Sequence, residues 1–158
     1  MDDADLNIYR SLNKHKVRYL LIGGMATILY GSPRITKDTD IFIESTENNC
    51  QRLVEALQAV HFHTVNLTTA EKILKNEVNI FKDYVRLDVL TQVKGLAFKE
   101  AWEKRVVKRV RGIRVPMVDI EDLIISKKAA GRDIDLHDVK TLKTIIRITQ
   151  NSHRKEKR

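Results

Sequence analysis

Two aspartates, Asp38 and Asp40, stand at the start of the apolar stretch DTDIFIE in the printed sequence. Side chains alternate along a β-strand, so residues at this spacing point to the same face, about 7 Å apart. Carboxylates beside a buried strand are costly unless their charge is compensated. The pair can therefore be a platform for a divalent cation, or a solvated strand edge that follows a loop.

A third carboxylate, Asp88, lies in YVRLDVL (84–90), on the face opposite the apolar residues of that predicted strand. If the two strands are neighbours, the three carboxylates converge. Like charges at close range raise one another's pKa unless a cation neutralises them. Hard oxygen ligands at an open site suit Mg²⁺ or Mn²⁺. The pattern therefore favours a metal site formed by Asp38, Asp40 and Asp88.

A glycine pair, Gly23-Gly24, separates an apolar run from a predicted short helix. Glycine lets the backbone approach a ligand closely, and the free N–H groups at a helix start favour an anion such as phosphate. Glycine pairs also serve packing alone in tight turns. The glycine pair followed by the acidic pair predicts a phosphate-binding turn next to a metal site.

Helices and strands interleave along the chain, which predicts the α/β or α+β class with a mixed sheet flanked by helices. We expect a single domain over residues 1–150 and a basic, disordered tail over 151–158. In the last helix, Leu136 and Val139 are expected on the inner face. The periodicity predicts helices over 5–16, 25–30, 46–61, 118–131 and 135–148, strands over 17–22 and 39–44, and hairpins over 76–90 and 105–118.

The charge, the apolar runs and the cysteine content of the sequence limit the classes of function that fit this chain. Lys and Arg number 29 against 21 Asp and Glu, for a net charge of +8. This balance favours polyanionic partners such as nucleic acid, nucleotides or phosphates, or it reflects a solvated surface with a basic tail. No apolar run reaches the length of a membrane span, and the first residues lack the features of a signal peptide. A single cysteine, Cys50, excludes an internal disulfide, so the cytoplasm is the expected location.

The glycine and aspartate motifs together resemble the pattern of a known family. In order and spacing, the motif residues resemble the signature of the DNA polymerase beta-like nucleotidyltransferase superfamily. The similarity is to its small prokaryotic branch, which is related to abortive-infection toxins and minimal nucleotidyltransferases. Asp88 fits the third acidic residue of that family. The residues that carry the resemblance are Gly23, Gly24, Gly31, Arg34, Thr36, Asp38 and Asp40.

A second block, SKKAAGRDIDLHDVKTL, is similar to the Lys-x-x-Ala-x-Arg-x-Lys-Asp-x-x-Asp helix pair of the same branch. Ile134 replaces the second lysine of that pattern, which leaves Lys127 and Arg132 to supply positive charge. The two aspartates of the block are interpreted as residues that cap and brace the last helix. The matching residues are Lys127, Ala130, Arg132, Asp135 and Asp138.

The resemblance implies a nucleotidyltransferase fold and a metal-dependent enzyme. Such enzymes move a nucleoside monophosphate from a nucleoside triphosphate to a hydroxyl and release pyrophosphate. It implies that Asp38, Asp40 and Asp88 are the catalytic and metal-binding residues, with Mg²⁺ or Mn²⁺ as the cofactor. The nucleotide-binding residues that it implies are Gly23, Gly24, Ser32, Arg34, Thr36, Lys127 and Arg132; for Arg34, a structural clamp on the Asp38 loop is the alternative.

The acceptor stays open at this point. A tRNA end or other RNA, a protein and a small molecule are all candidates, and the chain is a candidate toxin of a toxin–antitoxin pair. An antitoxin, a substrate-binding partner or a second copy in a homodimer are candidate partners. The basic hairpin 104–114 either carries nucleic-acid phosphates or is a solvated face. The alternative to an enzyme is a non-catalytic nucleotide- or nucleic-acid-binding module with the same fold.

Overall fold

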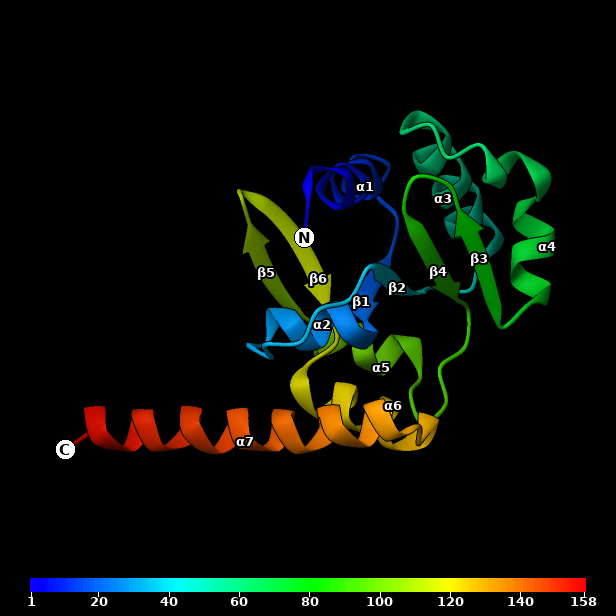
Figure 1. Ribbon diagram of the computed structural model, residues 1–158. Helices are drawn as coiled ribbons and strands as arrows, with labels where there is room; N and C mark the ends of the chain where they lie inside the picture. Colours follow the sequence, from blue (N-terminus) through cyan, green and yellow to red (C-terminus); the bar gives the residue numbers. More distant parts are fainter.

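The computed structural model describes all residues, 1–158. Six strands form one mixed sheet in the order β3-β4-β2-β1-β6-β5 (Figure 1), which confirms the expected class. The elements are α1 Asp3–Lys14, β1 Tyr19–Ile22, α2 Gly23–Leu29, β2 Asp38–Ile43, α3 Glu47–Ala59, the 3₁₀ helix η1 Thr64–Leu67, α4 Ala70–Lys75, β3 Val78–Lys82, β4 Arg86–Leu90, α5 Phe98–Glu103, β5 Val106–Val110, β6 Ile113–Met117, α6 Ile120–Ala130 and α7 Asp133–Glu156.

The register of the central strands decides which side chains meet. Strand β2 pairs in parallel with β4 and antiparallel with β1, and the hairpins β3–β4 and β5–β6 close the two ends of the sheet. Asp40 is the register partner of Asp88 on β4 and of Ile22 on β1. The strands that carry the predicted carboxylates are therefore direct neighbours.

The alternation of β2 separates the core from the acidic face. Thr39 donates a hydrogen bond to Asp5 of α1, and Ile41 and Ile43 are fully buried, so this face packs beneath α1 and α3. Asp38 and Asp40 point to the opposite face. Figure 1 shows α1, α3 and α4 on one side of the sheet and α2, α5, α6 and α7 on the other. The acidic face is therefore covered by α2 and the C-terminal helices.

The structure differs from the sequence-based expectation in its short elements and at its C-terminus. The short η1, α4 and α5 were not expected. Helix α7 continues to Glu156, where a disordered tail was expected from residue 151, although residues 147–158 are all exposed. The inward orientation of Leu136 was wrong, because its side chain is exposed and Asp135 is buried in its place. None of the helices combines the length and the apolar character that a membrane crossing requires.

Candidate active site

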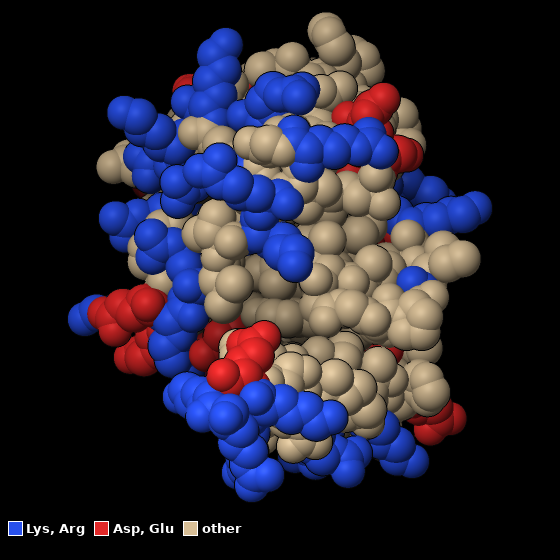
Figure 2. All heavy atoms as spheres, turned by 90° about the vertical axis from the view of Figure 1, so that its left-hand side faces the viewer, with Lys and Arg blue, Asp and Glu red and all other residues tan.

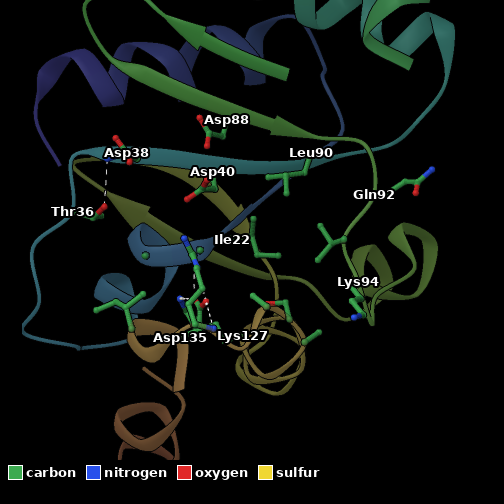
Figure 3. A pocket seen from close by; sticks show the side chains of 18 of the residues that line it. Ile22, Thr36, Asp38, Asp40, Asp88, Leu90, Gln92, Lys94, Lys127 and Asp135 are labelled. Atoms are coloured by element: carbon green, nitrogen blue, oxygen red, sulfur yellow. Dashed lines mark hydrogen bonds and ion pairs between the residues drawn. The ribbon is translucent and has the colours of Figure 1, made fainter. Parts of the chain in front are cut away.

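A pocket of about 410 Å³ opens between the acidic face of the sheet and the C-terminal helices (Figure 3). Its walls come from β2, β4, α2, the loop before β2, the loop after β4, and the junction of α6 and α7. Ser32 does not line it; this residue is buried, and its Oγ accepts a hydrogen bond from the Arg34 backbone at 3.4 Å. The predicted residues that line the pocket are Gly23, Gly24, Arg34, Thr36, Asp38, Asp40, Asp88, Lys127 and Arg132.

The three predicted carboxylates occupy one wall. Figure 3 shows Asp38, Asp40 and Asp88 together on the sheet side of the pocket. Burial, together with the negative charges of Asp88 and Asp38, raises the pKa of Asp40 to about 6, although Lys127 and Arg132 act in the opposite direction. This wall therefore carries negative charge that the protein alone does not fully compensate.

Asp88 already has a cationic partner that the sequence analysis missed. Arg86, two residues earlier on the same face of β4, donates two hydrogen bonds to the Asp88 carboxylate, at 2.9 and 3.2 Å. The spacing Arg-x-Asp on one strand was the signal for this pair. No group of three or more His, Cys, Asp or Glu side chains is arranged to hold a metal ion.

The donor set nevertheless fits a hard divalent cation. Asp38 and Asp40 offer carboxylate oxygens from the same face of β2, and Asp38 is exposed to solvent. Burial, and then the charges of Asp88 and Asp38, raise the pKa of Asp40, and a bound cation would favour its ionised form. Asp88 can join these ligands only if its contact with Arg86 loosens.

The glycine pair is explained by the close approach of two site side chains. Gly23 and Gly24 are the first residues of α2 rather than a separate turn. Gly23 has φ +73°, and a Cβ there would overlap the Asp40 carboxylate. A Cβ on Gly24 would lie 3.3 Å from Nη2 of Arg34. The two glycines therefore give Asp40 and Arg34 their space in the pocket.

Opposite the carboxylates lies a network of alternating charges. Asp138 Oδ2, which is fully buried, accepts from Arg34 Nη1 at 2.5 Å and from Lys127 Nζ at 2.7 Å. Asp135 lies 3.7 Å from Lys127 and pairs with Arg132 at 2.7 Å. Three cations and two anions leave one net positive charge. The network ties the loop before β2, which leads into Asp38, to α6 and α7, an arrangement compatible with Arg34 as a structural clamp on that loop.

Asp135 also fixes the start of α7, as the capping interpretation predicted. Its Oδ2 accepts a hydrogen bond from the Arg132 backbone N–H at 3.2 Å. Burial opposes ionisation, but the hydrogen bond and charge of Arg132 and the charge of Lys127 together lower the pKa of Asp135. Asp135 is therefore ionised at neutral pH, and it holds the side chains of Lys127 and Arg132 near the carboxylate wall.

The remaining wall is largely apolar and was not predicted. Gln92 and Lys94, in the loop after β4, lie on the opposite side of the pocket from Thr36 in Figure 3. This loop has no periodic pattern that would have marked it in the sequence. The other residues of this wall are Ile22, Leu90, Val93, Ser126, Ala129, Ala130 and Ile134.

Solved structures with a similar fold are nucleotidyltransferases or resemble them. A lincosamide antibiotic adenylyltransferase, LnuA, with lincomycin bound has a TM-score of 0.60 at 18% identity, over 92% of this chain and 98% of that one. An antigenic nucleotidyltransferase-like protein from Paracoccidioides brasiliensis also has a TM-score of 0.60, at 17% identity, over 94% of this chain and 78% of that one. No curated protein matches the sequence.

The sequence itself matches a protein family over almost its whole length. The match covers residues 3–154, and the family is described as "Nucleotidyltransferase of unknown function (DUF6036)". The matched range contains every residue of the pocket. The resemblance to nucleotidyltransferases drawn from the glycine and aspartate motifs is thereby confirmed. The chain belongs to this family of nucleotidyltransferases.

Proposed function

We propose that the protein transfers a nucleoside monophosphate from a nucleoside triphosphate to an acceptor hydroxyl, with a divalent metal as cofactor and pyrophosphate as the second product. One observation carries this proposal: a carboxylate wall faces a cationic network across a single pocket, in a chain that belongs to a nucleotidyltransferase family. A metal–triphosphate complex has this distribution of charge, with its cation beside carboxylates and its phosphates beside basic groups.

The carboxylate wall is the proposed metal site. Asp38 and Asp40 would hold Mg²⁺ or Mn²⁺, and Asp88 would join them when Arg86 turns away. When bound, the ion supplies charge neutralisation of the triphosphate and of the oxygens in the in-line displacement. The half-buried Asp40 carboxyl, whose pKa is raised by burial and by the charges of Asp88 and Asp38, is the feature of this chain that supports such an ion.

The opposite wall binds the phosphates in this proposal. The Arg132 side chain is 74% exposed, so its guanidinium can turn towards a phosphate. The Arg132 backbone N–H stays hydrogen-bonded to the Asp135 carboxylate meanwhile. Lys127 is buried and acts through its field rather than by contact. Gly23, Gly24 and Thr36 complete the phosphate contacts, while Ser32 supports the Arg34 loop from behind.

The reaction then needs only one displacement at phosphorus. The acceptor oxygen forms a bond to the α-phosphorus, the bond from that phosphorus to the oxygen bridging to the β-phosphate breaks, and pyrophosphate leaves. The acceptor proton passes to the Asp88 carboxylate or to solvent. The apolar wall with Gln92 and Lys94 is the proposed position of the nucleobase, because it offers apolar contact surface and two polar side chains.

The acceptor class is not decided by the fold, since similar folds serve many acceptors. The similar lincosamide adenylyltransferase is a precedent for an antibiotic acceptor. RNA, protein and small-molecule acceptors, a toxin role, an antitoxin partner and a homodimer stay predictions. A non-catalytic binding module is the outcome to be separated from the enzyme by experiment.

The test is calorimetric titration of each of the four nucleoside triphosphates, with Mg²⁺ and with chelator. The variant is Asp38→Ala/Asp40→Ala, and the charge-matched control is Glu55→Ala/Glu71→Ala on exposed positions of α3 and α4. We expect metal-dependent binding in the wild type and the control, and none in the variant. Binding that is equal with and without metal in all three proteins would favour the non-catalytic module.

A further inference from the structure

Helix α7 begins at the pocket and leads away from it. Arg132 is its N-cap and Asp135 lies in its first turn, and both line the pocket. The helix has 24 residues, which corresponds to about 36 Å. Figure 1 shows its C-terminal end extending beyond the sheet. A long acceptor that leaves the pocket along α7 would have this helix beside it over that length.

Four basic residues follow one face of this helix. Lys140, Lys143, Arg147 and Arg154 are spaced at i, i+3, i+7 and i+14, which places them on the same side. All four are exposed, and none forms an ion pair. No Asp or Glu occurs between positions 139 and 155. The positive charge of this face is therefore uncompensated along its length.

Lys128 of α6, the residue after Lys127, lies beside this face at Lys143 and is exposed. The Lys128 charge and its contact with Lys143 lower the pKa of Lys143, which shows that two cations lie close together. We call Lys128, Lys140, Lys143, Arg147 and Arg154 the α7 stripe. Figure 2, which faces the end of the molecule where α7 terminates, shows Lys and Arg side chains over much of this surface.

Carboxylates lie near both ends of the stripe. Asp133 in the first turn and Glu156 in the last are exposed, and Glu156 pairs with His153. The other two acidic residues of α7, Asp135 and Asp138, are buried in the charge network of the pocket. Between these ends, α7 itself contributes no exposed carboxylate to the stripe.

We propose that the α7 stripe binds the phosphate backbone of a nucleic-acid strand whose terminal hydroxyl is the acceptor in the pocket. This inference rests on the proposed function. Lys140 and Arg154 are about 21 Å apart along the helix, which matches about six nucleotides at about 3.4 Å each. A strand of this kind combines an extended polyanion with a hydroxyl at its end. The stripe carries no Phe, Tyr or Trp to stack on bases, so the binding is independent of sequence.

In the transfer step, the oxygen of the terminal hydroxyl bonds to the α-phosphorus of the triphosphate. The pyrophosphate departs with the bridging oxygen, and the hydroxyl proton passes to the Asp88 carboxylate or to solvent. The strand grows by one nucleotide. An RNA with a free terminal hydroxyl is therefore a substrate, whereas the same RNA with a terminal phosphate binds but is not extended.

The experiment measures binding of a fluorescent single-stranded RNA by anisotropy between 50 and 200 mM salt, concentrations at which phosphate contacts dominate. The variant is Lys140→Gln/Lys143→Gln/Arg147→Gln. The control, Lys72→Gln/Lys75→Gln/Lys82→Gln, removes the same charge from α4 and β3. Loss of three phosphate contacts lowers the log–log salt slope by about 2 and weakens binding on the order of 100-fold at 0.1 M salt. The control should stay within about twofold of the wild type, because only screened long-range charge is lost.

Equal weakening in the stripe variant and the control would overturn the proposal, as would no RNA binding at 50 mM salt. Binding to phosphatidylserine vesicles but not to RNA would also overturn it. Triphosphate titration keeps this inference separate from the proposed function. The stripe variant should bind triphosphate like the wild type, and Asp38→Ala/Asp40→Ala should still bind RNA. If neither the wild type nor the variants bind a triphosphate, the proposed function is wrong. The RNA measurement still tests whether the α7 stripe binds a phosphate backbone.

Discussion

Replacing Asp40 by Asn should stabilise the fold at neutral pH while it removes a proposed metal ligand. Burial and the charges of Asp88 and Asp38 raise the pKa of Asp40 from 3.8 to about 6. Each pKa unit corresponds to about 1.4 kcal/mol, so ionised Asp40 costs the folded state about 3 kcal/mol. Asn has nearly the same shape and carries no charge, so the variant avoids this cost.

The pH dependence follows from the direction of the shift. Between pH 3.8 and about 6, the folded state holds a proton on Asp40 that the unfolded state has released. Stability from this group is therefore fully present below pH 3.8, falls as pH rises, and is lost above pH 6. The advantage of Asp40→Asn over the wild type should be absent near pH 4 and reach up to about 3 kcal/mol above pH 7.

Urea denaturation in the presence of chelator, at pH 4 and at pH 7.5, measures this difference. Asp38→Asn is the matched control, because Asp38 is exposed, and its substitution should change stability by less than about 0.5 kcal/mol. Added Mg²⁺ should narrow the gap at pH 7.5 by stabilising only the wild type. The reasoning would be refuted if Asp40→Asn were no more stable than the wild type at pH 7.5. It would also be refuted if the gain in the free energy of unfolding were the same at pH 4 and at pH 7.5.

Three further predictions concern the rest of the site. Gly23→Ala forces a Cβ into a left-handed backbone and against Asp40, so we expect a loss of about 1–2 kcal/mol in thermal denaturation and weaker metal-dependent triphosphate binding. Asp138→Asn leaves buried Lys127 without the carboxylate that lies 2.7 Å from it, and this should lower the free energy of unfolding by about 3–5 kcal/mol. In urea denaturation, Asp138→Asn/Lys127→Met should recover part of this loss. A double variant less stable than the single variant would contradict this expectation. Truncation after residue 150 removes only exposed residues, so the free energy of unfolding should stay within about 0.5 kcal/mol of that of the full chain. A larger loss would mean that the end of α7 packs against another part of the protein.

The acidic wall was predictable because strands have a strict period of two. That period alone places Asp38 and Asp40 on one face, and it places Asp88 opposite the apolar residues of its strand. The same rule places Arg86 beside Asp88 on that face, where the two side chains form a hydrogen-bonded ion pair. The prediction of the mixed sheet rested equally on short apolar runs bounded by glycine and turn residues.

The cationic network was less accessible to sequence reasoning. Hydropathy places Leu136 inside and Asp135 outside, but the structure has the reverse arrangement, because the buried Lys127 requires carboxylate partners. Such a choice depends on a partner in another helix, which no periodic pattern encodes. The loop that carries Gln92 has no periodic pattern, so its position in the pocket is evident only from the three-dimensional structure.

The bond between Arg34 and Asp138 joins residues 104 positions apart in the chain. One wall of the pocket is complete only when the last helix has docked against the loop before β2. During synthesis, the strands that carry the carboxylates, β2 and β4, emerge before that helix does. A nascent or clipped chain that lacks α7 would keep Arg34 and Lys127 but lose Asp135 and Asp138, the carboxylates that hold these cations opposite the acidic wall. The cationic wall of the pocket is thereby assembled only after α7 has been synthesised and has docked.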